Sequence, residues 1–181
     1  EGEVQNMTRY PSATISFRVY EDSVNEVGLA KATLPDIAYK AVTITGSGMM
    51  GDIEVPLIGM LENMELGLDF LGHTDPGTFP MLMEPRKHLI ELRVAEEYWD
   101  VEDAEVGLWG IKHVLVARPK LLKPGGLIPA TAADSSGTFT VYAYKAYRDG
   151  KELWDLDKRN MRCVINGKDW MADVRKALGY N

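Results

Sequence analysis

Hydrophobic and polar residues alternate most regularly between positions 137 and 147. The two alternating sets are Phe139, Val141 and Ala143, and Tyr142, Tyr144 and Ala146. A two-residue period is typical of a β-strand, whose successive side chains point to opposite faces. The pair Asp149-Gly150 then tolerates the positive φ angles of a type I′ turn. The pattern therefore predicts a β-hairpin whose second strand covers residues 151–157.

Strand-like composition recurs along the chain. Nine segments alternate or are rich in β-branched and aromatic residues: 14–20, 29–34, 37–45, 61–70, 87–99, 107–118, 138–148, 151–157 and 161–165. Three segments have the composition of loops, and the second leaves room for one helical turn: 47–58, 72–86 and 119–137. Runs of strands without intervening helices predict a mostly antiparallel β-sandwich or barrel.

A short helix is predicted at the C-terminal end. After the turn Asn166-Gly167, Asp169 is placed to cap a helix over residues 169–178, and Gly179 is placed to end it. The residues expected to share its apolar face are Trp170, Val174, Ala177 and Leu178.

Length and charge indicate one globular domain over residues 1–181, with an N-terminal arm over residues 1–13. We expect no membrane insertion, because no apolar run approaches the ~20 residues that cross a bilayer. We expect no secretion by a signal peptide, because the start of the sequence does not combine a basic region, an apolar core and a cleavage site. The net charge of −7 disfavours nucleic-acid binding through a basic surface. The single cysteine, Cys163, excludes an internal disulfide and a thiolate zinc cluster, and we expect it to be buried.

The spacing of Gly46, Gly48 and Gly51 matches the glycine fingerprint of dinucleotide-binding folds. That fingerprint requires a following helix, whose N-terminal amides hold the pyrophosphate. The residues that follow are rich in β-branched types and include Pro56, which disfavours a helix. We therefore expect no cofactor here and predict that residues 47–58 form a projecting loop.

Other candidate chemistry is weak. His73, His88 and His113 are too widely separated to form a metal-binding pair, and each is expected to be a polar surface residue or partly packed. The acidic run 96–105 lacks the glycine of a calcium loop and predicts a solvated turn between two strands. Because no catalytic signature is present, the sequence favours a protein that is not an enzyme and has no metal or cofactor.

The order of motifs resembles that of the major tail tube proteins of contractile-tailed phages and R-type bacteriocins. The resemblance is carried by the C-terminal stretch 149–179 and by residues 15–20, 32–35 and 46–53, and it covers nearly the whole chain. It implies that copies form hexameric rings whose sheets join into an inner barrel. It also implies that stacked rings form a conduit with an acidic lumen, through which DNA passes without binding.

The same resemblance implies a location and a set of partners. The expected location is a virion tail or a phage-tail-like particle assembled in the bacterial cytoplasm. Besides further copies of the chain, the expected partners are the sheath, the baseplate, the tape measure protein and the tail terminator.

Three candidate surfaces follow from the residues. The projecting loop exposes apolar side chains that suit a contact between subunits or rings; its residues are Gly46, Gly48, Met49, Met50, Gly51, Ile53, Val55 and Leu57. Alternation places Asn63, Glu65 and Asp69 on a polar face opposite Met64, Leu66 and Leu68, and we assign that polar face to the lumen. The acidic turn is assigned to the sheath through Asp100, Glu102, Asp103 and Glu105.

Three alternatives stay open. The chain could be the tube of a bacteriocin or of a secretion-type injection system, and a neutral or weakly charged lumen would favour a bacteriocin. It could be a nucleotide-dependent enzyme that uses the loop Gly46-Gly48-Gly51, although the expected lack of a helix disfavours this. It could also be a monomeric β-barrel binding module, an alternative supported by fold class alone.

Overall fold

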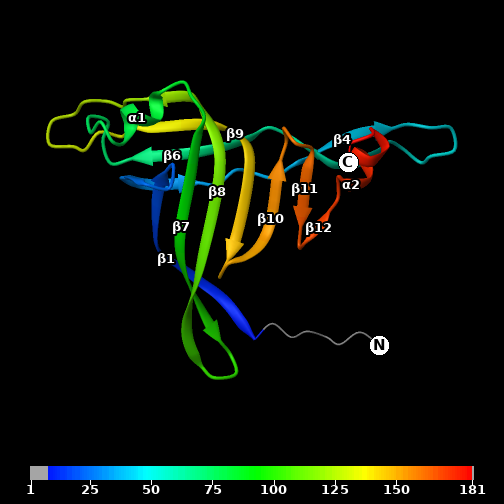
Figure 1. Cartoon of the computed structure of the whole chain (residues 1–181), viewed down its shortest axis with the longest axis horizontal. Coiled ribbons are helices and arrows are strands. Elements are labelled where there is room, and N and C mark those ends of the chain that lie inside the picture. The colour runs from blue at the N-terminus through cyan, green and yellow to red at the C-terminus, as the bar shows by residue number, and fades with distance from the viewer. Residues whose placement is uncertain (1–7, 181) are drawn as a thin grey trace.

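The computed structural model describes residues 8–180, which form a strongly curved antiparallel sheet with projections at its margins (Figure 1). The strands are β1 (Arg9–Glu21), β2 (Asn25–Val27), β3 (Leu29–Thr33), β4 (Tyr39–Ile44), β5 (Ile53–Leu61), β6 (Met64–Phe70), β7 (His88–Asp100), β8 (Glu105–Lys123), β9 (Ser136–Arg148), β10 (Lys151–Asp157), β11 (Arg162–Ile165) and β12 (Lys168–Asp169). Two short helices accompany them, α1 (Phe79–Met83) and α2 (Ala172–Ala177). The predicted fold class, mostly antiparallel β with a short C-terminal helix, is confirmed.

The main sheet has the strand order β12-β11-β10-β9-β8-β7-β1-β2. Outside this order, β6 pairs with β9, and β3 pairs with β6. Strand β9 holds this arrangement together because two different strands share one of its edges. Its residues 136–141 pair with β6, whereas residues 143–148 pair with β10. The sheet therefore divides along β9 into two wings, as the diverging directions of β6 and β10 show (Figure 1).

A β-bulge at Tyr142 makes this division possible. In the pairing of β8 with β9, Val116 lies opposite Ala143 while its neighbour Ala117 lies opposite Val141, so Tyr142 is the extra residue. The bulge reverses the alternation of faces, and as a result both Val141 and Tyr144 are buried in the core. The prediction that Tyr144 and Ala146 face away from Phe139 and Val141 was therefore wrong.

The core lies on the concave side of the sheet. It takes alternate residues of β6, in agreement with the alternation predicted there, together with residues of the central strands and of α1. Its most deeply buried members include Met64, Leu66, Leu68, Leu82, Ile90, Leu115, Phe139, Tyr144 and Leu156. Helix α1 closes one end, where the rings of Phe70 and Phe79 meet edge to face with centroids 5.2 Å apart.

Local turn signals predicted their structures correctly. Asp149 and Gly150 have φ angles of 48° and 80°, and Asn166 and Gly167 have 49° and 78°, as type I′ hairpin turns require. Gly179 ends the C-terminal helix with a φ of 78°. That helix is shorter than predicted, because residues 168 and 169 form β12 and the helix begins at Ala172.

Two predicted boundaries were wrong. The segment 119–137, expected to be a loop, begins with the last residues of β8, which continues to Lys123, and ends with the first residues of β9. Pro119 fits in the strand because it lies next to a register shift, where the ladder is already irregular. Residues 9–13 of the expected N-terminal arm 1–13 belong to β1, and residues 1–7 of it lie outside the described part of the chain.

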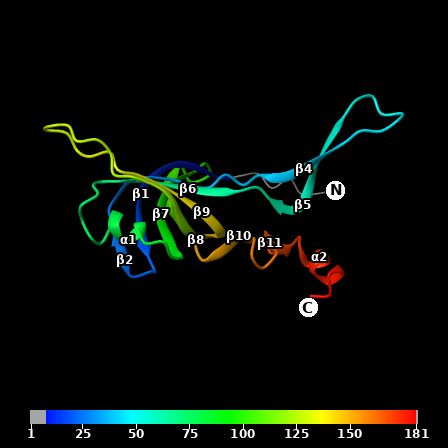
Figure 2. The ribbon, with the colours of Figure 1, turned by 90° about the horizontal axis from the view of Figure 1, so that it is seen from above.

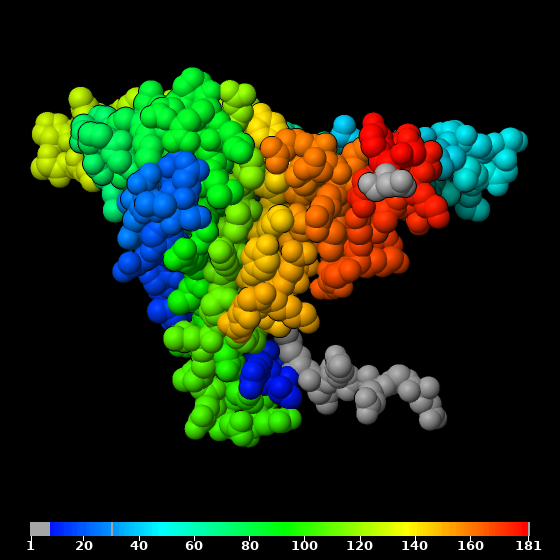
Figure 3. Space-filling view, in the orientation of Figure 1, coloured from blue at the N-terminus to red at the C-terminus, as the bar shows by residue number. Residues whose placement is uncertain are grey.

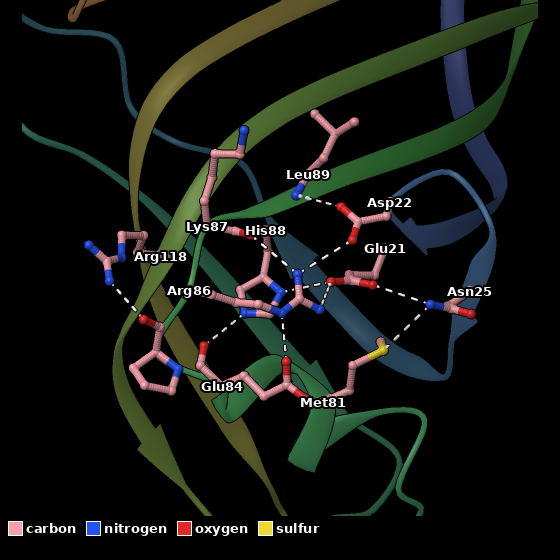
Figure 4. Close-up of polar contacts among 11 residues, drawn as sticks. Glu21, Asp22, Asn25, Met81, Glu84, Arg86, Lys87, His88, Leu89 and Arg118 are labelled. Carbon is pink, nitrogen blue, oxygen red and sulfur yellow. Dashed lines mark hydrogen bonds and ion pairs between the residues drawn. The ribbon is translucent and has the colours of Figure 1, made fainter.

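A buried polar cluster ties the end of β1 to the start of β7 (Figure 4). Glu21 and His88 are 1% and 0% exposed. One Glu21 oxygen lies 2.8 Å from His88 Nδ1 and accepts a 2.6 Å hydrogen bond from Arg86, while Asn25 donates to the other oxygen at 3.3 Å. The second ring nitrogen of His88 faces the carbonyl oxygen of Glu84 at 2.9 Å. The expected surface or partly packed position of His88 was therefore wrong, since it is a fully satisfied buried residue.

The charge of Glu21 should support the fold. Burial by itself raises the pKa of Glu21, but hydrogen bonds from His88, Asn25 and Arg86 outweigh it and hold the pKa below its ordinary value. A carboxylate with a lowered pKa stabilises the folded state above its unfolded pKa, and this contribution is lost as the pH falls through the folded pKa.

We expect Glu21→Gln to lower the free energy of unfolding at pH 7 by about 3 kcal/mol, because the substitution leaves buried donors without their anion. Below about pH 4.5 the gap between wild type and variant should narrow, because the wild-type carboxylate becomes protonated. Urea unfolding across the pH range measures both effects. The control is Glu26→Gln, whose carboxylate forms only an exposed 3.6 Å pair with Arg18. A difference in unfolding free energy between wild type and Glu21→Gln that does not change with pH would contradict the stabilising role of the Glu21 charge.

Candidate assembly surfaces

Strands β4 and β5 form a two-stranded sheet of their own, which projects from the body (Figure 2) and extends past the C-terminal region in the space-filling view (Figure 3). Ile44 pairs with Ile53 and Val42 pairs with Val55, so these four side chains share one face of the hairpin. They are between 37% and 49% exposed. A lone two-stranded hairpin is at best marginally stable in water. This apolar face, here called the arm face, is therefore a surface suited to a partner.

The tip of the arm contains the glycine motif. Gly48 and Gly51 have φ angles of 94° and 123°, and Thr45 donates a 2.8 Å hydrogen bond to Asp52 across the loop. The motif thus shapes a hairpin loop and is followed by β5, whereas the dinucleotide fingerprint needs a helix at that point. Met50 is fully exposed there.

Residues 47–58 were predicted to form a projecting loop, but the second half of this segment is a strand. Residues 53–58 belong to β5, because Ile53 and Val55 are held in the ladder by β4. Leu57 is half-buried and lines a cleft at the base of the arm instead of extending from it.

The arm joins the body through an apolar cleft of about 350 Å³. The cleft is lined by Tyr39, Pro56, Leu57, Ile58, Gly59, Cys163, Ile165 and Trp170. Gly59 has a φ of 65°, and a Cβ there would collide with the side chain of Met171. Cys163 is buried as predicted, and burial raises the pKa of its thiol, followed in importance by the charge of Asp169. The cysteine is therefore a packing residue of the arm joint.

The predicted polar face of β6 is present but is not purely acidic. Glu65 and Asp69 alternate with buried leucines, and Asn63 precedes the strand and donates to Glu65 at 3.2 Å. Lys120 of β8 contacts the Glu65 carboxylate, and Lys31 of β3 lies opposite Asp69. Each acid thus has a basic neighbour. The assignment of this face to the lumen stays a prediction.

The β7–β8 hairpin extends beyond the body and ends in the acidic turn (Figure 1). Asp100 is buried, where it accepts 2.9 Å and 3.1 Å hydrogen bonds from Arg9 of β1 and from the backbone of Glu102. The Arg9 hydrogen bond is the first cause of its lowered pKa. Inclusion of Asp100 in the exposed acidic surface was therefore wrong. Glu102, Asp103 and Glu105 are exposed, and their sheath contact stays a prediction.

An aromatic stack beneath the acidic turn was missed from the sequence. The rings of Tyr98 and Trp109 stack at 4.6 Å, with the guanidinium of Arg9 5.1 Å from the first ring and that of Arg148 4.7 Å from the second. Cation–π contacts on both outer faces stiffen the hairpin. Tyr98 and Trp109 are 11 residues apart in sequence and meet only through the register of β7 with β8, so composition gave no indication of this cluster.

Metal-binding clusters and membrane-spanning helices are not found in the part of the chain that the structure describes. Over residues 8–180, no group of three or more histidine, cysteine or acidic side chains is arranged to hold a metal ion. Neither described helix is long and apolar enough to cross a membrane. His113 was expected to be a polar surface residue or partly packed, and it is buried. It contacts the hydroxyl of Tyr144 at 3.0 Å, and desolvation lowers its pKa.

The curved sheet and its projecting apolar arm define a mostly antiparallel β domain with an exposed apolar projection. A family model described as phage tail tube protein FII matches residues 11–179, and the chain belongs to that family. The family confirms the resemblance drawn from the sequence and the role as a structural component, not an enzyme, of a tail or phage-tail-like particle. A comparison with curated protein sequences gave no match.

Solved structures share the fold. A chain from the sheath-tube complex of an extracellular contractile injection system, PVC, is 15% identical, with a TM-score of 0.55 over 76% of this chain and 92% of that one. A sheath/tube terminator of the same system is 16% identical, with a TM-score of 0.53 over 76% and 97%. The tube-terminating cap of the anti-feeding prophage is 14% identical, with a TM-score of 0.54 over 81% and 95%.

Substitution at the joint should loosen the arm. Because Gly59 combines a positive φ with contact to Met171, we expect Gly59→Ala to lower the free energy of unfolding by about 1–3 kcal/mol. The matched control is Gly72→Ala, where an added Cβ meets nothing within 4 Å. Calorimetry gives the stability, and amide exchange in β4 and β5 reports the arm. If Gly59→Ala and Gly72→Ala have the same free energy of unfolding and the same amide exchange in β4 and β5, the joint does not restrict residue 59.

Proposed function

We propose that this chain builds the inner tube of a contractile tail or tail-like particle, with copies joined into hexameric rings that stack. The observation that carries the proposal is the arm face, because an exposed hydrophobic patch rimmed by polar residues marks a protein interaction site. A second copy can cover it. The arm and the body are different surfaces, so the contact is head to tail and closes into a ring when the rotation allows it.

The proposed partners follow from the family and from the similar structures. One similar chain comes from a sheath-tube complex and two are terminators or caps, which supports a sheath and a terminator as partners here. A baseplate and a tape measure protein complete the set that the family resemblance implies. For a phage tail, the cargo of the tube is DNA that passes without specific binding.

A second candidate is the tube of a bacteriocin or of another injection system. The observation that favours it is the charge balance on the polar face of β6, where Glu65 contacts Lys120 and Asp69 lies opposite Lys31. If that face lines the lumen, it lacks the uniform negative charge that repels a passing polyanion. Particles purified with capsids and nuclease-protected DNA support the phage tail, whereas active particles without DNA support the second candidate.

The arm face can be tested without breaking the hairpin. The double substitution Ile44→Lys with Ile53→Glu places an ion pair at a cross-strand position, so the hairpin keeps a favourable pairing but loses its apolar face. We expect rings and rods of the purified protein, seen by negative-stain microscopy, to disappear. The control Thr43→Lys adds a charge on the opposite face beside Glu54 and should assemble. Normal assembly of the double variant would refute the role of the arm face.

A further inference from the structure

A basic groove of about 440 Å³ crosses β1, β7 and β8 on the face of the sheet opposite the core. Its floor is formed by Ser16, Ala95 and Gly110, which lie opposite one another in register. The next row of the same face supplies a wall of three cations, Arg18, Arg93 and Lys112, again directly opposite one another. The side chains of this row are 67%, 52% and 46% exposed.

Three like charges in one cross-strand row oppose sheet stability. Buried Glu91 offsets part of the repulsion, because one of its carboxylate oxygens lies 2.5 Å from Arg93 Nε and 3.5 Å from Lys112 Nζ. Both cationic side chains remain about half exposed beside this buried carboxylate. Tyr20 holds the Arg93 guanidinium 4.5 Å above its ring. The three cations outnumber the two carboxylates that contact them, Glu91 and Glu26, the second of which lies 3.6 Å from Arg18. The groove is therefore a positive surface on a chain with a net charge of −7, and it suits an anionic partner.

The acidic turn of the β7–β8 hairpin has the complementary charge. Glu102, Asp103 and Glu105 are exposed, and within residues 8–180 none of the three forms an ion pair. The turn is preorganised, since Asp100 is held by Arg9 and the backbone N–H of Val101 donates to Thr8 at 2.8 Å. A preorganised turn loses little conformational freedom on binding.

We propose that the basic groove of one copy binds the acidic turn of a second copy. Three exposed acids at the end of a protruding hairpin face three exposed cations along a groove, and each copy carries both halves of the contact. The contact is therefore head to tail and propagates through the assembly. It rests on the proposed self-assembly and adds an electrostatic contact, separate from the arm face, that sets the register between copies.

Charge exchange tests the contact with one protein. The groove variant is Arg18→Glu with Lys112→Glu, which leaves Arg93 to neutralise Glu91 and converts the row to alternating charges that a sheet tolerates. The turn variant is Glu102→Lys with Asp103→Lys. The control for the groove variant is Lys87→Glu with Lys151→Glu, which changes the net charge equally at exposed positions outside the groove. Circular dichroism checks that each variant is folded.

Sedimentation then measures the critical concentration for assembly. We expect the groove variant and the turn variant each to raise it about tenfold or more, because two attractive pairs become repulsive. The control should match wild type. A 1:1 mixture of the two variants, and the protein that combines both exchanges, should recover assembly.

Three outcomes would overturn the proposal. If wild type and control assemble while the groove variant assembles equally well, the groove is not a contact between copies. If only the turn variant assembles normally, or if the combined exchange fails to recover assembly, the two surfaces do not meet, and the turn remains available for a sheath. If wild type forms no species larger than a monomer at any concentration, the proposed self-assembly fails as well.

Discussion

The structure depends on the two successive pairings along one edge of β9. Backbone groups on that edge must be hydrogen-bonded over the full length of the strand, and no single neighbour does this. Strand β6 satisfies the first half and β10 satisfies the second, with the bulge at Tyr142 between them. Division of the sheet into two wings follows from this constraint. The wings in turn create the concave surface that holds the core and place the arm and the acidic turn at separate margins of the molecule.

Buried carboxylates on the face of the sheet opposite the core are each compensated by nearby cations. Glu91 and Asp155 are almost fully buried, and each lies close to two cations. Glu91 contacts Arg93 of its own strand and Lys112 of β8, whereas Asp155 contacts Lys145 of β9 and Arg162 of β11. A buried carboxylate is tolerated when cations compensate it, and long basic side chains do so while their ends remain in water. The acidic chain therefore presents a locally basic surface at the centre of its sheet, a feature that its net charge alone would not indicate.

Local signals made much of the fold predictable from the sequence. The conformation of the turn Asp149-Gly150 is determined by its own two residues. The alternation from Met64 to Phe70 follows from the burial of one face of that strand. Features that depend on distant partners were not predictable in this way. The bulge at Tyr142 arises from competition between β6 and β10, and the burial of Asp100 depends on Arg9, which is 91 residues away. For the candidate surfaces, sequence located the projecting segment but not its hairpin form, and it gave no indication of the basic groove.

The joint between the arm and the body has a thermodynamic consequence. Gly59 and Met171 interlock at the base of the hairpin, next to the side chain of Cys163. The direction of the arm is thus fixed when the subunit folds, before any neighbour is present. In the proposed assembly, each added subunit then loses less orientational freedom than one with a flexible tether would, so more of the hydrophobic free energy remains as net affinity. Under that proposal, growth can proceed through weak individual contacts whose direction is already set in the free subunit.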